Sequence, residues 1–582
     1  MNNFKLLWKH IKIRRRKQLL VFVCLMLLAS FLEILSVGSV LPFIGALTNP
    51  EEVFQSNYLQ PIISLLGITS SKQILMPLTA IFISASIFTG IIRIALLYVS
   101  NRLAQAMGAD LSLEIYQRTL HQDYSVHISR NSSEIVTSII TKTNLVCDGI
   151  LLPIMNLISS SFIIVALMSV LFIIDTLVAL ILATSIGGLY LLVMIYSRSQ
   201  IQENSRIIST LSTKKVKSLQ EGLGSMRDIL LSQAQNFYFK IYRDADLPVR
   251  RAFATLAFIG GSPKYAIEAL GMTIVALLAY SMSNQDLSSS SSIAVLAAFA
   301  IGAQRILPTF QLSYASYSLI KGSNESFKDV LQLLEQPLPK VSNQGSNHDI
   351  TFKDKIELRN VSFRYSDNAP WIFQNVNLEI KNGEHVGFVG PTGTGKSTLI
   401  DILLGLLLPS EGGLFIDGIQ IDETNRGSWQ KKIAHVPQMI VLSDNSVEEN
   451  IAFATDKSEI NIKRVSKAAK EAQLSELIES WPEKYQTLIG ENGIKISGGQ
   501  RQRIGIARAL YNESQVLFFD EATSALDNKT EKNFMKSLGE LSNNITLLMI
   551  AHRLTTLEHC NKIIELNNSK NLTETQYNVL VK

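Results

Sequence analysis

Long apolar stretches dominate the first 320 residues and limit what this chain can fold into. Six runs are long enough to cross a membrane as helices, which takes about 20 mostly apolar residues. Their approximate bounds are 18–45, 73–100, 149–172, 176–197, 252–283 and 291–320. The chain of 582 residues is 47% hydrophobic and 18% charged, which fits a membrane part joined to a water-soluble part. We therefore predict an all-α transmembrane domain of six spans over residues 1–330.

Basic residues orient the predicted spans. Lys and Arg are frequent in the first 17 residues and in residues 198–251, whereas residues 49–72 contain only Lys72. Because loops rich in Lys and Arg stay in the cytosol, both termini should lie there, in a multi-pass protein of the cytoplasmic (inner) membrane. The segments 101–148 and 198–251 carry helical apolar spacing and predict helices that extend beyond the bilayer. FKLLWKHIKI, residues 4–13, is basic and amphipathic, so we expect it to lie along the inner face of the membrane.

The character of the sequence changes after residue 330. Residues 331–352 are polar and rich in turn formers, and residues 353–582 alternate short β-like runs with helical stretches, as in an α/β domain. The sequence GPTGTGKS, residues 390–397, lies between the strand-like HVGFVG and the helical TLIDILLGLL. This context favours a phosphate-binding P-loop. The predicted phosphate-binding residues are Gly390, Pro391, Thr392, Gly393, Thr394, Gly395, Lys396, Ser397 and Thr398.

Two carboxylates follow an apolar strand in VLFFDE, residues 516–521. Next to a P-loop, Asp520 at the strand end is suited to the Mg²⁺ shell together with Ser397. Glu521 is then placed to polarise the attacking water. A second glycine-rich helix start follows Ser497 in ISGGQRQRIGIARAL, residues 496–510, and such a start also attracts an anion. The chain therefore carries two sites suited to phosphate.

The sequence ISGGQ resembles the LSGGQ signature of ATP-binding cassette (ABC) transporters, with Ile496 in place of the usual leucine. Other motifs follow in that family's order: Tyr365 in VSFRY, Gln438 in HVPQ, IGENG at 489–493, Asp527 in SALD and His552 in IAHR. The resemblance covers the whole chain, membrane half first and nucleotide half second, as in exporter half-transporters. It implies an α/β P-loop NTPase domain after the membrane domain, and ATP hydrolysis coupled to transport with ATP and Mg²⁺ as cofactors.

The resemblance also implies roles for single residues. Tyr365 would stack on adenine, Gln438 would sense Mg²⁺ and the nucleophile, and His552 would contact the γ-phosphate, while Asp527 would belong to the loop at the dimer interface. Two chains would face each other head to tail, most simply as a homodimer, with a heterodimer left open. The residues closing on the partner's ATP would be Ser497, Gly498, Gly499 and Gln500. The first coupling helix is expected near Tyr124–Ser133 and the second near Glu221–Arg227.

The membrane half resembles bacterial flippases for lipid-linked oligosaccharides and related polysaccharide exporters. The resemblance rests on FLEILSVGSVLPFI at 31–44, HISRNSSEI at 127–135 and AAFAIGAQRILPTFQ at 297–311. It implies a lipid-linked oligosaccharide or glycolipid as the transported substrate, and export of peptides, drugs or other lipids is the alternative. A soluble ABC ATPase acting on nucleic acid is excluded by the six apolar runs, and the net charge of +5 is small for this length.

Several ionisable residues fall within the predicted spans, where a charge usually faces a cavity or a partner. Lys264 and Glu268 are four residues apart and predict a local ion pair. Arg93 and Arg305 have no obvious local partner in the sequence. They either attract the pyrophosphate head group of a lipid, or reach the membrane surface or another helix. We therefore treat Arg93, Arg305 and Glu33 as candidate substrate-binding residues.

Overall fold

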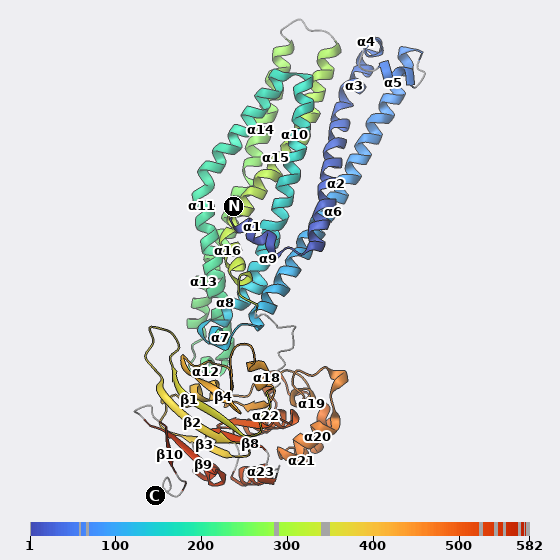
Figure 1. The fold of residues 1–582 in the computed structure, drawn as a ribbon. Coiled ribbons are helices and arrows are strands. Elements are labelled where there is room, and N and C mark those ends of the chain that lie inside the picture. The colour runs from blue at the N-terminus through green and yellow to red at the C-terminus, as the bar shows by residue number, and fades with distance from the viewer. Residues whose placement is uncertain are drawn as a thin grey trace. The chain divides into compact units, whose positions relative to one another are not determined.

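The computed structural model describes the chain except for residues 1, 57–59, 66–68, 284–289, 339–349, 523–527, 541–544, 551–553, 568–571, 576 and 578–582. It divides into two compact units. Unit 1 comprises Met1–Gln122 and Arg130–Pro339, and unit 2 comprises Asp123–Ser129 and Lys340–Lys582. Figure 1 shows that unit 1 is built from helices and that unit 2 contains the β-sheets. The expected fold class, a helical membrane domain followed by an α/β domain, is confirmed.

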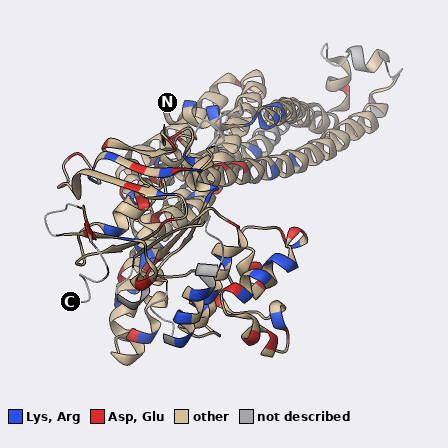
Figure 2. Cartoon of the chain, turned by 60° about the horizontal axis from the view of Figure 1, so that its bottom comes forward, with Lys and Arg blue, Asp and Glu red and all other residues tan. Residues whose placement is uncertain are grey.

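Four helical stretches among the described residues are long and apolar enough to cross a membrane: Ile13–Thr48, Leu75–Leu120, Ser132–Ile174 and Thr176–Gly224. Figure 2 shows the long helices of unit 1 mostly without charged residues. Two further helices, α14 and α15, occupy the predicted fifth and sixth spans. The helices of unit 1 are α1 (Asn2–His10), α2 (Ile13–Gly38), α3 (Val40–Thr48), α4 (Pro50–Gln55), α5 (Gln60–Leu65), α6 (Leu75–Leu120), α8 (Ser132–Thr137), α9 (Thr143–Val146), α10 (Leu152–Ile174), α11 (Thr176–Gly224), α12 (Met226–Leu231), α13 (Gln235–Gly261), α14 (Pro263–Ser283), α15 (Ser290–Gly322) and α16 (Asn324–Leu334), with π-helical stretches at Ser138–Lys142 and Cys147–Leu151.

Local chemistry explains where the helices of unit 1 end. The turn expected between the third and fourth spans is present, because the Asp175 carboxylate accepts hydrogen bonds from the N–H groups of Leu177 and Val178 at 2.9 and 3.1 Å and caps α11. The predicted fifth span, 252–283, is not one helix. It is divided at Ser262, which keeps helical backbone angles (φ −61°, ψ −35°), because Pro263 has no N–H to continue the hydrogen-bond ladder and favours the first position of a new helix. Helices α6 and α11 continue without a break past the ends of the predicted spans at residues 100 and 197, and their extension beyond the bilayer stays a prediction.

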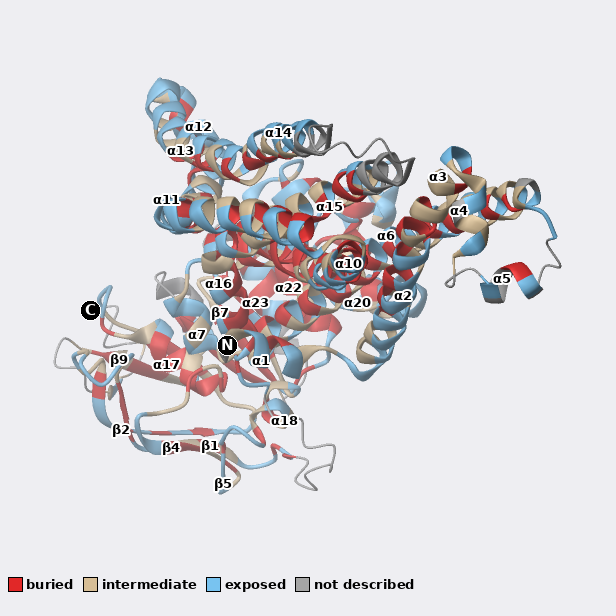
Figure 3. Cartoon of the chain, turned by 90° about the horizontal axis from the view of Figure 1, so that it is seen from above, coloured by how far each residue is buried: buried red, intermediate tan, exposed pale blue. Residues whose placement is uncertain are grey.

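Unit 1 buries the faces that its helices turn toward each other and leaves apolar side chains on its outer surface. Figure 3 shows buried residues on the inner sides of α6, α10 and α15 and exposed residues on the outer sides. Outward apolar side chains such as Ile91, Ile94 and Leu97 are more than half exposed. In water this surface would be unfavourable, whereas in a bilayer the acyl chains cover it.

Unit 2 contains two sheets. The antiparallel sheet has the order β2-β1-β4-β5, and the larger sheet has the order β10-β9-β3-β8-β7-β6, parallel except for β10. The strands are β1 (Lys355–Phe363), β2 (Phe373–Lys381), β3 (His385–Val389), β4 (Glu411–Ile416), β5 (Ile419–Gln420), β6 (Ile433–Val436), β7 (Val516–Asp520), β8 (Thr546–Ile550), β9 (Lys562–Leu566) and β10 (Leu572–Thr575). The helices are α7 (Tyr124–Ser129), α17 (Lys396–Leu403), α18 (Arg426–Gln430), α19 (Val447–Ile451), α20 (Ile462–Glu471), α21 (Ser475–Ser480), α22 (Gly498–Tyr511) and α23 (Asn528–Glu540).

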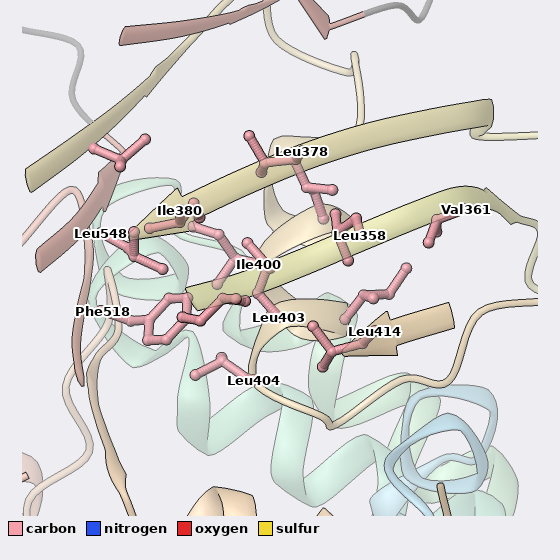
Figure 4. Packing of buried hydrophobic residues seen from close by; sticks show 14 of the residues in the cluster. Leu358, Val361, Leu378, Ile380, Ile400, Leu403, Leu404, Leu414, Phe518 and Leu548 are labelled. Atoms are coloured by element: carbon pink, nitrogen blue, oxygen red, sulfur yellow. The ribbon is translucent and has the colours of Figure 1, made fainter. Parts of the chain in front are cut away.

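Helix α17 lies at the centre of a hydrophobic core between the two sheets. Figure 4 shows Ile400 and Leu403 of α17 among side chains from both sheets, including Leu358 of β1 and Phe518 of β7. Each fully buried side chain of this kind contributes about 1.5–3 kcal/mol to folding. Because α17 begins at Lys396, this core also fixes the position of the P-loop.

Candidate functional site

Two glycines shape the P-loop between β3 and α17. At Gly390 the backbone has φ +142°, and a Cβ atom would come within 2.2 Å of the Leu566 carbonyl oxygen. At Gly395 the backbone has φ +99°, and a Cβ atom would lie 2.7 Å from Cγ2 of Ile372. Only glycine fits at either position without displacing a neighbour. Because these two glycines carry no side chain, the backbone of the loop can approach a phosphate chain closely.

The Lys396 ammonium group lies over the P-loop. Its Nζ donates hydrogen bonds to the carbonyl oxygens of Gly390 at 2.7 Å and Pro391 at 2.9 Å. Burial lowers the pKa of Lys396, and the charges of Glu521 and Asp520 act in the opposite direction. Phosphate oxygens can take the place of these two carbonyl oxygens with a gain, because hydrogen bonds between charged groups are stronger than those to neutral acceptors.

A cavity of about 540 Å³ brings most of the predicted nucleotide-binding groups together. Its volume is within the range of about 300–1,000 Å³ that is usual for small-molecule sites. Ser397, Gln438 and Asp520 offer hydroxyl, amide and carboxylate oxygens, which are the ligands that Mg²⁺ prefers. The residues therefore fit a nucleotide with its metal ion. The predicted residues that line the cavity are Thr392, Gly393, Gly395, Lys396, Ser397, Thr398, Gln438, Asp520 and Glu521.

Glu521 is fixed at the end of β7 by contacts to three parts of the chain. Its backbone has φ +50°, an uncommon value for a residue with a side chain, and its N–H donates to the Ile550 carbonyl at 3.1 Å. The Gln438 side-chain amide donates to the Glu521 carboxylate at 2.7 Å. Gln502 of α22 donates to the Glu521 carbonyl at 3.2 Å. These contacts direct the carboxylate into the cavity, where it can accept a proton from water.

Gln502 was missed in the sequence. It is 4% exposed and connects α22 to the strand end that carries the two carboxylates. The available signal was a polar residue within an apolar helical run, RQRIGIARAL, where burial requires a hydrogen-bond partner. The partner itself, a backbone carbonyl 19 residues away, could not be read from the sequence.

Tyr365 lies beside the P-loop helix. Its hydroxyl is 3.0 Å from the Thr398 hydroxyl, and its ring meets Phe363 edge to face with centroids 5.1 Å apart. The residue is 51% exposed. An exposed ring held by a hydrogen bond at one end and a packed aromatic at the other can serve as a stacking surface for a base.

The signature helix α22 begins with two reciprocal hydrogen bonds. The Ser497 hydroxyl accepts from the Gln500 N–H at 3.2 Å, and the Gln500 side chain accepts from the Ser497 N–H at 2.9 Å. The Gln500 side chain thus has a capping role that the sequence interpretation did not include. Ser497 and Gly498 are exposed residues. Among the described residues that line the cavity, none comes from this helix start. Asp527 and His552 lie outside the described residues, so their predicted roles stay predictions.

Comparisons with known proteins agree with this geometry. The profile of the ABC transporter family matches residues 373–524, and that of the ABC transporter transmembrane region matches residues 19–306. The chain belongs to the ABC transporters. This ABC exporter is 27% identical over 500 residues to an ATP-dependent lipid A-core flippase of Cupriavidus pinatubonensis. The matched residues cover 84% of this chain and 83% of the relative. It is 28% identical over 599 residues to the heterocyst differentiation ATP-binding protein HepA of a Nostoc species, over 99% of this chain and 94% of the relative.

A solved structure gives the same fold. The exporter aligns with a bacterial Atm1-family ABC exporter with ATP bound at a TM-score of 0.77 and 21% identity, covering 97% of this chain and 96% of that chain. The predicted half-transporter architecture is therefore confirmed. As a member of this family, the protein binds ATP and couples ATP hydrolysis to transport.

The exporter carries a short segment of the membrane half, Asp123–Ser129, within unit 2. This segment contains α7, within the region expected for the first coupling helix. Asp123 forms an ion pair with Arg426 at the start of α18. Burial raises the pKa of the Tyr124 phenol, and the charges of Asp401 and Tyr365 add to the shift.

The candidate substrate residues in unit 1 form one ion-pair cluster. Arg93 Nε is 2.5 Å from Glu33 Oε1, and Arg305 Nη1 is 2.8 Å from Glu33 Oε2. The Glu33 side chain is fully buried. The sequence indicated no local partner for either arginine, and both indeed pair with a carboxylate on another helix, which is the interhelical alternative. We call Glu33, Arg93 and Arg305 the membrane triad. The local pair predicted for Lys264 and Glu268 is confirmed at 3.8 Å.

A cavity of about 240 Å³ with both polar and apolar lining residues lies next to the membrane triad. Arg93 lines it together with the polar side chains of Ser100, Asn156, Ser160 and Thr309. Ser160 is 1% exposed, and its hydroxyl has no hydrogen-bond partner among the described residues. A buried hydroxyl without a partner costs about 1–3 kcal/mol, so this cavity is suited to a polar ligand or water.

Proposed function

We propose that the exporter moves a lipid-linked oligosaccharide or related glycolipid across the cytoplasmic membrane. The observation that carries this proposal is the membrane triad, in which two guanidinium groups share one buried carboxylate. The name of the Cupriavidus relative, a lipid A-core flippase, supports a lipid as the substrate. Residues 1–330 would form the membrane domain, 331–352 the linker and 353–582 the cytosolic nucleotide domain, with both termini in the cytosol.

The charge balance of the membrane triad favours an anionic group in the substrate. With all three side chains ionised, the triad carries a net charge of +1. An uncompensated charge within a hydrocarbon environment is costly, and an anion at the adjacent cavity would lower that cost. Arginine binds phosphate oxygens with two parallel hydrogen bonds, which makes a phosphate or pyrophosphate head group a suitable ligand. Glu33 would hold the two guanidinium groups in place rather than contact the substrate.

The nucleotide site would work in a dimer, most simply a homodimer. Ser497, Gly498 and Gly499 are exposed or partly exposed and are not among the residues that line the cavity of their own chain. They are therefore available to a nucleotide held by Lys396 of a second copy. ATP would join the two nucleotide domains because it gains contacts from both only when they meet. Hydrolysis would remove the bridging phosphate and let the domains separate.

The residues of the nucleotide cavity have distinct proposed tasks. Ser397, Gln438 and Asp520 would hold Mg²⁺, which when bound neutralises charge on the phosphates. Lys396 would bind the β- and γ-phosphates, and Tyr365 would stack on the adenine. Glu521 would accept the proton of the attacking water. Gln438 joins the Mg²⁺ position and Glu521 because its side-chain amide already donates to the Glu521 carboxylate.

Movement of a polyprenyl-diphosphate-linked glycan between the two leaflets of proteoliposomes containing the exporter tests the substrate directly. Wild-type exporter with ATP is expected to move the glycan between leaflets and to hydrolyse ATP faster when the glycan is present. The Glu521→Gln variant is expected to show neither effect. Movement would be scored by accessibility of the glycan to an impermeant sugar-modifying enzyme. Stimulation by peptides or amphipathic drugs, with no response to the glycan, would assign the exporter to the alternative class.

Neutralising both arginines of the membrane triad separates substrate binding from ATP chemistry. The Arg93→Gln/Arg305→Gln variant is expected to lose most glycan movement and glycan-stimulated ATPase, while its basal ATPase stays near that of the wild type. The reason is that unit 2 contains the whole described nucleotide cavity. The measurement is glycan movement and basal ATPase on the same preparation.

The matched control is Lys264→Gln/Glu268→Gln, which removes a half-exposed pair from another helix of unit 1. It is expected to transport normally. Size-exclusion chromatography of each variant checks folding, because the double replacement leaves Glu33 buried without its partners. Unchanged glycan transport in a well-folded Arg93→Gln/Arg305→Gln variant would refute the proposed role of the membrane triad.

A further inference from the structure

An apolar groove of about 620 Å³ runs beside the N-terminal helix of unit 1. We call it the elbow groove. Fifteen of its seventeen lining residues are apolar, and the other two are Arg16 and Lys17. Side chains of α1, α2, α6 and α10 form it, among them Leu7, Trp8, Phe22, Met26, Met107 and Met155. Its volume is large enough for a small-molecule ligand.

Contacts between charged and polar side chains hold the walls of the elbow groove in place. His10 Nδ1 is 2.9 Å from Glu114 Oε1, and Arg15 Nε is 2.7 Å from Asp110 Oδ2. These contacts tie α1 and the start of α2 to α6. The ring of Phe4 packs on that of Phe327 with centroids 5.6 Å apart, which also ties α1 to α16. The groove is therefore formed before any ligand enters, which lowers the entropy cost of binding.

Two cations, Arg16 and Lys17, line the elbow groove, and neither forms an ion pair with any described residue. The Arg16 guanidinium donates to the carbonyl oxygens of Trp8 at 2.7 Å and Ile11 at 3.0 Å, and it lies 5.1 Å from the Trp8 ring centroid. Neutral carbonyls and a ring position this charge but do not cancel it. Arg14 and Lys17 are exposed, and neither forms an ion pair with any described residue.

We propose that the elbow groove binds an anionic phospholipid of the bilayer, with an acyl chain among the apolar side chains and the phosphate at Arg16 and Lys17. The apolar floor disfavours a water-soluble anion, and the basic mouth favours an anionic head group over a neutral one. Trp8 at the mouth is 49% exposed, which suits a residue at the boundary between water and acyl chains. Phe22 lines both this groove and the cavity beside the membrane triad. The lipid is a resident partner and is distinct from the transported substrate.

Native mass spectrometry of the full-length exporter in detergent can measure this binding with phosphatidylglycerol and phosphatidylcholine of identical acyl chains. The wild type is expected to bind phosphatidylglycerol at least ~5-fold more tightly than phosphatidylcholine. The Arg16→Gln/Lys17→Gln variant should lose about 10-fold or more in affinity for phosphatidylglycerol and little for phosphatidylcholine. Arg206→Gln/Lys214→Gln removes two exposed cations of α11 and is expected to change neither affinity.

Filling the groove provides a second test that leaves the charges in place. Val23 lines the elbow groove and is 39% exposed, so Val23→Trp adds bulk into the groove rather than into a packed core. This variant is expected to bind both lipids more weakly. Equal binding of the two lipids by the wild type, or phosphatidylglycerol binding that neither variant changes, would overturn the proposal. So would loss of the dimer in Val23→Trp, because the groove would then be a contact between copies of the chain.

Discussion

Replacing Glu521 with glutamine is expected to lower the rate of ATP hydrolysis by about 10²–10⁴-fold while ATP still binds. Glutamine keeps the size of the side chain and can still form a hydrogen bond with Gln438, which contacts the carboxylate at 2.7 Å. It cannot accept a proton from water, so the step that needs a base becomes slow. The measurements are single-turnover hydrolysis and equilibrium binding of a fluorescent ATP analogue on the same protein.

The matched control for this variant is Glu476→Gln on α21. Glu476 is exposed and forms no ion pair with any described residue, so its replacement makes the same change of charge away from the cavity. We expect wild-type hydrolysis from the control. A Glu521→Gln exporter that hydrolyses ATP at more than a tenth of the wild-type rate would show that another group accepts the proton.

The local parts of the nucleotide site were predictable from the sequence because each depends on neighbouring residues. A glycine-rich loop between an apolar strand and a helix strongly favours a P-loop. The structure has β3, the loop and α17 in that order. The carboxylates at the end of β7 were predictable in the same way, because they directly follow an apolar strand in the sequence. Gln438 and Tyr365 came from motif order in a known family, which records spatial relations that a single sequence does not contain.

Contacts between distant segments were not predictable. Glu33 and Arg305 are 272 residues apart, and nothing in the local pattern of either helix indicates that they face each other. The Gln502 contact to the Glu521 carbonyl and the Asp123–Arg426 pair also join segments that are distant in the sequence. Periodicity fixes which face of a helix is buried but not which helix covers it. The break at Ser262 was missed for a different reason, since Pro263 lies within an apolar run that otherwise favours one continuous span.

Two inactive variants are expected to restore activity when they are combined in one dimer. Lys396→Ala removes the phosphate-binding ammonium group, and Ser497→Arg places a long cation at the exposed start of α22. Each variant alone should hydrolyse ATP at a small fraction of the wild-type rate, because every site in its homodimer contains one defective part. If a nucleotide site combines the P-loop of one chain with the signature of the other, a mixed dimer has one intact site and one with both defects.

Co-expression of the two variants with different affinity tags, followed by purification on both tags, isolates the mixed dimers. Their ATPase rate should approach about half that of the wild type if the two sites act independently, and should fall below this value if closure needs both. A mixed dimer as inactive as its parents is the contrary outcome, because it is what sites built within one chain would give. The exposed position of Ser497 and its absence from the residues that line its own chain's cavity favour restoration. Recovery in the mixed dimer would also answer why one chain carries two helix starts suited to phosphate, since each would serve a different copy of the protein.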